Sequence, residues 1–168
     1  MAEYRKTEVL KQYSPVNEGV IDRLLNEEIN KSQTKFVVLD DDPTGIQTVH
    51  DISVFTDWSK ASMRKGFIDE NRLFYILTNS RSMTPEQTRQ VHEEIARTAE
   101  EISRELNQKY VLISRSDSTL RGHYPLETNV LKEVMEKQGG HSVDGEILCF
   151  FFKEGGRYTI DNVHYVKD

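Results

Sequence analysis

The chain has 168 residues, of which 36% are hydrophobic and 30% charged, with a net charge of −6 and a pI of about 5.4. The length fits one domain of ordinary size, and the acidic balance argues against nucleic-acid binding, which needs a basic field. No apolar run approaches the ~18 residues of a membrane span and no signal-peptide pattern is present, so we expect a cytoplasmic protein with neither nucleic-acid nor membrane partners.

Residues 1–34 are predicted to form a polar leader with one helix. The apolar residues with helical spacing there are Val20, Ile21, Leu24, Leu25 and Ile29. Further elements are predicted in the first half of the chain from apolar runs and their flanking residues. They are a strand over 35–40, a short strand over 52–56, a helix over 58–66 and a strand over 73–78.

The strongest helix signal follows residue 83. Thr84 at the N-cap, Pro85 at the first helical position and Gln87 three residues after the cap form a capping box. Apolar residues then recur at helical spacing to about Asn107. The remaining predicted elements are a strand over 110–113, a helix opened by Tyr124-Pro125 and ended by Gly139-Gly140, a strand over 146–152 that buries Cys149, and a strand or hairpin arm over 158–165.

The alternation of strands and helices predicts an α/β fold with a mainly parallel sheet. Because the strands are apolar throughout, we expect helices on both faces, in a Rossmann-like three-layer arrangement. Residues 1–34 are assigned to the leader and 35–168 to one α/β domain. The chain stops after an extended segment with no closing helix, so we expect the domain to be incomplete at its C-terminus. A sheet edge left open in this way could pair with a second copy as a homodimer.

Clusters of polar residues follow four of the predicted strands. They are DDDPTG (40–45), NSRS (79–82), SRSDSTLRG (114–122) and KEGGR (153–157). Because the carboxyl ends of parallel strands share one edge of a sheet, and ligands bind in the crevice there, we expect the four clusters to form one site.

Three adjacent carboxylates, Asp40, Asp41 and Asp42, repel one another and need a partner. They could hold Mg²⁺, bind the hydroxyls of a polyol or supply a general base, while one or two of them could be turn and cap residues only. The arginines of the second and third clusters suit a carboxylate or phosphate, because a guanidinium engages two oxygens at once; they could also pair with the aspartates. Together these groups match a small polyhydroxy acid.

The histidines are interpreted by position. His50 and His123 closely follow two of the clusters and could touch a ligand, whereas His92 and His141 are expected at the surface. The ligand spacing of a zinc site is absent, so no metal site is predicted.

Four segments resemble the four-carbon acid sugar kinase family, and specifically its N-terminal domain. They read VLDDDPTGIQTVH (38–50), LTNSRS (77–82), ISRSDSTLRGHYPLE (113–127) and FFKEGGRYTI (151–160). The resemblance covers about 35–168. It implies the substrate-binding part of a two-domain kinase that uses ATP and Mg²⁺ to phosphorylate four-carbon sugar acids such as threonate and erythronate. The nucleotide site would lie in the C-terminal domain, outside this chain, so this polypeptide alone is expected to be inactive.

The resemblance also implies roles for individual residues. Asp41 or Asp117 would orient or deprotonate the accepting hydroxyl, and the arginines would bind the substrate carboxylate. The other residues expected to bind substrate are Asp40, Asp42, Thr44, Gly45, Asn79, Ser80, Arg81, Arg115, Ser116, Ser118, Arg121 and Gly122. No cofactor-binding or metal-binding residue is expected in this chain.

Two other functions fit parts of the sequence. A haloacid-dehalogenase-like, Mg²⁺-dependent phosphatase would use Asp40 and Asp42 of an Asp-x-Asp-x-Thr motif, with Thr78 in its second motif. That alternative leaves the arginine-rich third cluster unexplained, and no later acidic pair completes its Mg²⁺ site. A non-catalytic binding domain would use the same pocket without chemistry.

Overall fold

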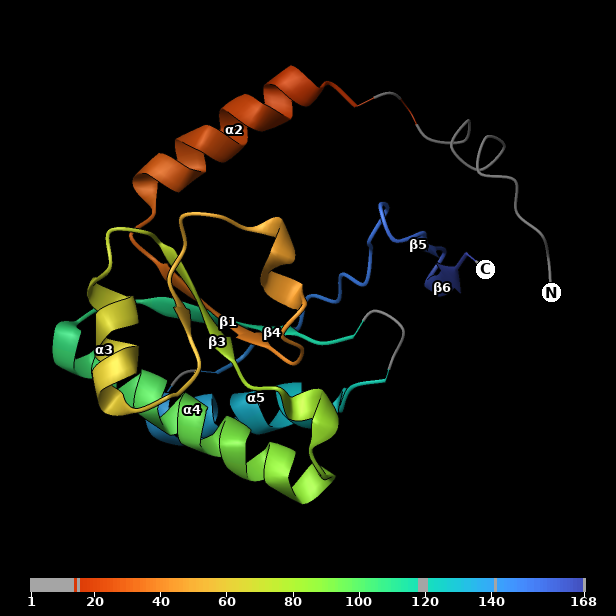
Figure 1. The fold of residues 1–168 in the computed structure, drawn as a ribbon. Coiled ribbons are helices and arrows are strands. Elements are labelled where there is room, and N and C mark those ends of the chain that lie inside the picture. Colours follow the sequence, from red (N-terminus) through yellow and green to blue (C-terminus); the bar gives the residue numbers. More distant parts are fainter. Residues whose placement is uncertain (1–13, 15, 118–120, 141, 168) are drawn as a thin grey trace. The chain divides into compact units, whose positions relative to one another are not determined.

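The computed structural model describes residues 14, 16–117, 121–140 and 142–167 (Figure 1). The chain divides into two compact units, Met1–Gln33 and Thr34–Asp168. In the first unit, helix α2 (Glu18–Lys31) begins after Asn17, whose side-chain oxygen accepts a hydrogen bond from the backbone N–H of Val20 at 3.2 Å. This satisfies one of the amides that every helix start leaves unpaired. The helix predicted in this region is confirmed.

The second unit is built on a four-stranded parallel sheet. Its strands are β1 (Lys35–Asp40), β2 (Val54–Phe55), β3 (Leu73–Leu77) and β4 (Tyr110–Arg115), in the order β2-β3-β1-β4. Asp40, the last residue of β1, lies opposite Leu77 of β3 and Arg115 of β4. The carboxyl ends of the three longer strands therefore meet at one edge of the sheet, and the predicted α/β class with a parallel, Rossmann-like sheet flanked by helices is confirmed.

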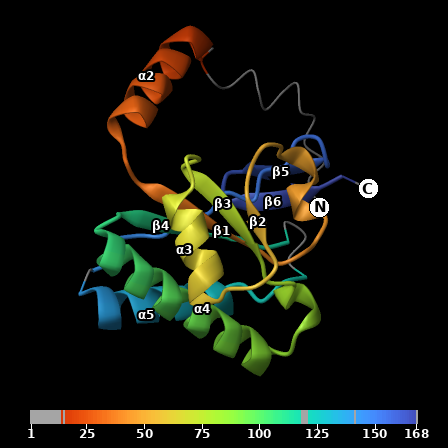
Figure 2. The same ribbon diagram turned by 60° about the vertical axis from the view of Figure 1, so that its left-hand side comes forward.

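Three helices pack against one face of this sheet, as Figures 1 and 2 show: α3 (Lys60–Ile68), α4 (Pro85–Leu106) and α5 (Leu126–Gly139). The buried core between the helices and the sheet consists of Val37, Leu39, Met63, Phe67, Phe74, Ile76, Ile95, Ala96, Ala99, Ile102, Leu131 and Val134. On the opposite face Phe36, Val111 and Ile113 are 37%, 43% and 40% exposed, so in the described part of this unit helices cover one face of the sheet, and not both faces as the sequence predicts.

Helix α4 forms where its local signals place it. Thr84 and Gln87 make both hydrogen bonds of the capping box, and the helix ends at Asn107 in the left-handed conformation. Its buried stripe includes Ile95, Ala99 and Ile102. Local capping and periodicity thus predict this helix to within a residue.

The strand predicted over 146–152 is wrong. This segment makes no ladder with the four-stranded sheet; a single bridge joins Phe152 to Arg157, Ile147 is 94% exposed, and Cys149 is exposed rather than buried. An apolar run supplies strand propensity, but a strand also needs a partner edge, which the local sequence does not specify. The hairpin arm is confirmed as an antiparallel pair, β5 (Arg157–Ile160) and β6 (Val163–Val166). None of the helices in the described part of the chain has the length and apolar character of a membrane span.

Candidate functional site

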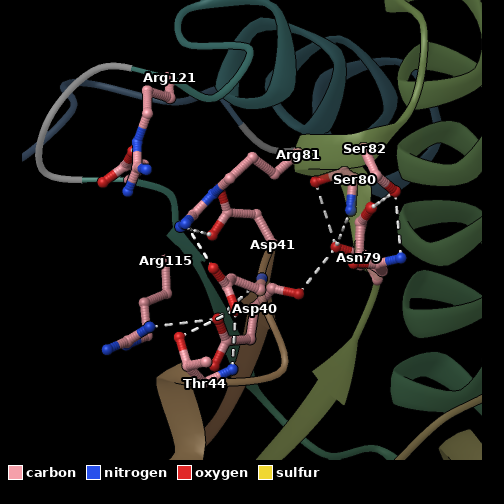
Figure 3. Close-up of polar contacts among 12 residues, drawn as sticks. Asp40, Asp41, Thr44, Asn79, Ser80, Arg81, Ser82, Arg115 and Arg121 are labelled. Carbon is pink, nitrogen blue, oxygen red and sulfur yellow. Dashed lines mark hydrogen bonds and ion pairs between the residues drawn. The ribbon is translucent and has the colours of Figure 1, made fainter.

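Three of the four polar clusters meet at the carboxyl edge of the sheet. The backbone N–H of Asp41 donates to the carbonyl of Arg115 at 3.4 Å, and the N–H of Arg81 donates to the carbonyl of Asp41 at 3.3 Å. Figure 3 shows Asp40 and Asp41 between the guanidinium groups of Arg115 and Arg81, with Arg121 on the same side. The convergence expected from a parallel sheet is therefore present for the clusters that follow β1, β3 and β4.

Asp41 is held by a two-point ion pair with Arg81. Arg81 donates from Nε to Oδ2 at 3.1 Å and from Nη2 to Oδ1 at 2.9 Å, and it also contacts Asp42. Asp41 is only 2% exposed. Burial raises the pKa of Asp41 because it disfavours the charged form, and Arg81 opposes that rise. Arg81 is thus the group that keeps a negative charge tolerable at this buried position.

Asp40 is fully buried and pairs with Arg115, whose Nη1 donates to Oδ1 at 3.1 Å. Burial raises the pKa of Asp40, and Arg115 acts against that rise. The second oxygen, Oδ2, has no hydrogen-bond partner among the described residues. A Cβ added at Gly45 would overlap both this carboxylate and the Arg115 guanidinium. Glycine at position 45 therefore lets the chain close over the Asp40–Arg115 pair.

Two further carboxylates complete the edge. Asp42 accepts from the N–H and the hydroxyl of Thr44 at 2.8 and 2.9 Å, and these bonds lower the pKa of Asp42. Asp117 is 8% exposed and pairs with Arg121, whose side chain is 66% exposed. The close approach seen at Gly45 recurs at Gly122, where a Cβ would overlap the hydroxyl of Ser116.

The site therefore sets four carboxylates against three guanidinium groups, and each of the four carboxylates contacts a guanidinium. Arg115 and Arg121 are the more exposed of the three, at 40% and 66% of their side chains against 23% for Arg81. Such a site offers carboxylate oxygens to hydroxyl groups and exposed N–H donors to one anionic group. Among the described residues, no three acidic, histidine or cysteine side chains are grouped as metal ligands.

A family model described as a sugar-binding N-terminal domain matches residues 36–168. The chain belongs to this sugar-binding N-terminal domain family. No curated protein and no solved structure matches the chain. The matched region contains the sheet, except for the first residue of β1, and all three clusters at its edge, so the edge is the candidate sugar site of this sugar-binding domain.

Two other residues of the predicted site in the sugar-binding domain form hydrogen bonds outside the carboxylate–guanidinium pairs. The amide of Asn79 donates to the hydroxyl of Ser82 at 3.1 Å, and Ser80 points into the interior. The fourth cluster is not brought to the edge: it forms a turn before β5, closed by the N–H of Gly156 on the carbonyl of Lys153 at 3.0 Å. The expectation that all four clusters form one site is corrected accordingly, because the strand that would have carried the fourth cluster to the edge is absent. Ser118 and His141 lie outside the described residues.

Of the histidines in the sugar-binding domain, His92 differs from expectation. His50 is exposed and pairs with Asp51 at 2.8 Å, while Nε2 of His123 lies 3.0 Å from the carbonyl of Met83. His92, expected at the surface, is 1% exposed. Its position one turn before Ile95 and Ala96 on the buried face of α4 is a periodicity signal that could have placed it inside. Sequence reasoning also missed Glu127, which is 1% exposed beneath the site.

We expect acid to destabilise the sugar-binding domain through His92. Burial lowers the pKa of His92 from its usual value of 6.5, and the neighbouring His123 also lowers it. Glu127 and Asp41 act in the opposite direction, because their negative charges favour the protonated ring. The unfolded chain then binds more protons than the folded one below about pH 6.5, so the stability contributed by neutral His92 is complete above that pH and is lost as the pH falls towards the folded pKa. The melting temperature should decrease between about pH 7 and about pH 5.

The His92→Gln variant isolates this contribution. It removes the titrating ring, so the decrease in melting temperature over the same pH window should become smaller. Asp40 and Asp41, whose pKa values are raised in the folded state, act in the opposite direction at lower pH and are present in both proteins. Identical pH profiles for the two proteins would contradict the assignment to His92.

Proposed function

We propose that this chain is the substrate-binding N-terminal part of an ATP-dependent kinase that phosphorylates a four-carbon sugar acid of the threonate or erythronate type. The observation that carries the proposal is the convergence of Asp40–Asp42, Arg81, Arg115 and Asp117–Arg121 at one sheet edge. Membership of a sugar-binding family supports a sugar as ligand. Three of the four segments that resemble the acid sugar kinases build this edge.

A sugar acid matches the charges of the site. Its hydroxyl groups would donate to the aspartates, while its carboxylate would accept from the exposed N–H groups of Arg115 and Arg121. Asp41 or Asp117 would orient or deprotonate the hydroxyl that is phosphorylated. A raised pKa, as Asp41 has, makes a carboxylate a stronger base towards an alcohol.

ATP and Mg²⁺ would be held outside this chain. The described residues do not fit Mg²⁺, because they contain no group of three candidate ligands and each aspartate of the site contacts an arginine. This polypeptide is therefore assigned recognition of the sugar acid, and no phosphoryl transfer is expected from it alone. A non-catalytic binding domain would show the same binding.

The phosphatase alternative is less compatible with the geometry. Its nucleophile would be Asp40, which is 0% exposed and bonded to Arg115. An attacking carboxylate must reach a phosphorus atom, and this one is covered by Gly45. Turnover of a phosphate monoester in the presence of Mg²⁺ would nevertheless establish the phosphatase and contradict our proposal.

Ligand-induced stabilisation tests the proposal directly. At about 100 times the dissociation constant, threonate or erythronate should stabilise the domain by about 2.7 kcal/mol, a melting shift of roughly 5–10 °C for a domain of this size. Arg121→Ala should abolish the shift, because the exposed guanidinium would bind the ligand carboxylate. Arg97→Ala is the matched control, since Arg97 is 58% exposed and pairs with Glu93 on α4. The absence of a shift with every stereoisomer would refute sugar-acid binding by this chain.

A further inference from the structure

A second polar cluster lies beneath the candidate sugar site. Its members are buried side chains from the end of β3, the turn η2 (Ser80–Ser82), α4 and α5. They are Thr78 at 3% exposure, Ser80 at 0%, Thr88 at 0%, His92 at 1% and Glu127 at 1%. Buried polar groups lower stability unless they are hydrogen-bonded, and apolar residues of similar size would often hold a core as well. Their presence at this position therefore points to a role in the site above them.

The cluster forms a directional chain of hydrogen bonds. The hydroxyl of Ser80 donates to Oε1 of Glu127 at 2.8 Å, and the N–H of Ser80 donates to Oγ1 of Thr78 at 3.3 Å. The hydroxyl of Thr78 in turn donates to the carbonyl of Asp40 at 2.9 Å. Each of these three hydrogen bonds has a defined donor and acceptor. Together they link α5, through Ser80 and Thr78, to the end of β1.

This chain fixes the residue that precedes Arg81. The turn η2 follows Asn79, whose φ of 54° is in the left-handed region, and the carbonyl of Ser80 accepts from the N–H of Met83 at 3.0 Å. Arg81 then reaches back to Asp41 with its backbone N–H and with its guanidinium. A shift of Ser80 would therefore move both contacts that hold Asp41.

His92 lies below Glu127, too far away to form a hydrogen bond with it. Nδ1 of His92 lies 2.8 Å from the carbonyl of Thr88, and because a carbonyl only accepts, Nδ1 carries the hydrogen. Nε2 of the same ring faces Oε1 of Glu127 at 3.8 Å. Oε2 of Glu127 has no hydrogen-bond partner among the described residues. Oε1 is thus the oxygen that connects Glu127 to the site.

We infer that Glu127 is a positioning residue for the sugar site: acting through Ser80, it holds the turn η2 so that Arg81 stays clamped on Asp41. The inference takes its ligand from the proposed function but its geometry from the buried hydrogen bonds. The clamp can therefore be measured without any sugar, which separates a failure of this inference from a failure of the proposed function.

The direct readout is the side-chain Nε–Hε signal of Arg81 in a proton–nitrogen correlation spectrum of the 168-residue chain without ligand. The signal is assigned by its absence in Arg81→Lys. Glu127→Leu should lose it or move it to the range of solvent-exposed arginines, whereas Glu127→Gln, which keeps an acceptor oxygen for Ser80, should retain it. Ser80→Ala removes the hydroxyl that links Glu127 to the turn η2, and it changes the side-chain volume less than Glu127→Leu does. It should also lose or shift the Arg81 signal, and it replaces Glu127→Leu in the test if Glu127→Leu does not fold.

Glu100→Leu is the matched control. Glu100 is also a buried acid, at 6% exposure, and it accepts from the hydroxyl of Tyr110 at 3.0 Å away from the site. A merely structural role for Glu127 predicts that Glu127→Leu and Glu100→Leu both melt earlier and both keep the Arg81 signal. The positioning role predicts that only Glu127→Leu and Ser80→Ala lose it.

Titration with threonate or erythronate supplies the second arm. At a temperature where the variants are folded, Glu127→Leu should weaken binding about tenfold, the effect of one charged hydrogen bond, while Glu127→Gln and Glu100→Leu bind as the unaltered chain does. An Arg81 signal unchanged in Ser80→Ala, or in a folded Glu127→Leu, would overturn the inference. A signal lost in Ser80→Ala and Glu127→Leu, in a chain that binds no sugar acid, would support the clamp and reject the proposed ligand.

Discussion

Replacing Arg81 with methionine is expected to lower the free energy of unfolding by about 3–5 kcal/mol at neutral pH, because the change leaves a buried carboxylate without its partner. Asp41 is 2% exposed and both of its oxygens are engaged by Arg81. Methionine fills much of the space of the arginine stem, so the loss reports the charge more than the packing. Urea denaturation followed by circular dichroism measures it.

The matched control for Arg81→Met is Arg64→Met on the protein surface. Arg64 pairs with Glu105, and the two side chains are 47% and 41% exposed. Exposed ion pairs contribute about 0–1 kcal/mol, so this variant should remain close to the original stability. An equal loss in both variants would show that burial of Asp41 is not the cause.

The effect of Arg81→Met should also depend on pH. The pKa of Asp41 is already raised by burial, and removing Arg81 takes away the group that opposes the rise. Protonation then removes the unpaired charge, so the stability difference between the two proteins should be largest near pH 7 and smaller near pH 4. A difference that is the same at both pH values would contradict the assignment to Asp41.

Gly45→Ala is expected to destabilise the domain by about 1–3 kcal/mol, as overpacking of a close-packed site does. A Cβ at this position would overlap the carboxylate of Asp40 and the guanidinium of Arg115, so the ion pair must separate or the chain must shift. Binding of the sugar acid should weaken in parallel, because Arg115 would lose its position. Thermal unfolding and a ligand titration measure the two effects.

Gly145→Ala serves as the control for Gly45→Ala. No heavy atom lies within 4 Å of a Cβ built at Gly145, so the variant should stay within about 0.5 kcal/mol of the original chain. If Gly45→Ala melts and binds like Gly145→Ala, the covering role of Gly45 is wrong.

Much of the fold follows from local signals in the sequence. Helix α4 is predicted by its capping box and its 3.6-residue period, and β1, β3 and β4 are predicted by continuous apolar runs. The convergence of three polar clusters follows from one topological rule, that parallel strands share a carboxyl edge. These inferences succeed because each depends on neighbouring residues or on strand direction alone.

The pairing within the site could not be predicted in the same way. The sequence indicates that aspartates and arginines share a site, but Arg81 faces Asp41 and Arg115 faces Asp40 only because of the registers of β3 and β4 on β1. The segment over 146–152 is the opposite case. It is apolar like a strand, but apart from the single bridge from Phe152 to Arg157 it pairs with no strand in the described residues. Long-range geometry, not residue type, decides both outcomes.

The separation in sequence between the contacting residues of the site has a consequence for folding. Arg115 and Asp40 are 75 residues apart, Glu127 and Ser80 are 47 apart, and Arg81 and Asp41 are 40 apart. Contacts between residues so far apart in the sequence cannot form until the intervening loops have closed. Parallel strand pairing is slow for this reason. Helix α4 can gain its cap early, whereas the edge exists only once β1, β3, β4 and α5 are all in place. Ligand binding by a refolding chain should therefore appear after the helical signal, as a late event that reports completion of the whole domain.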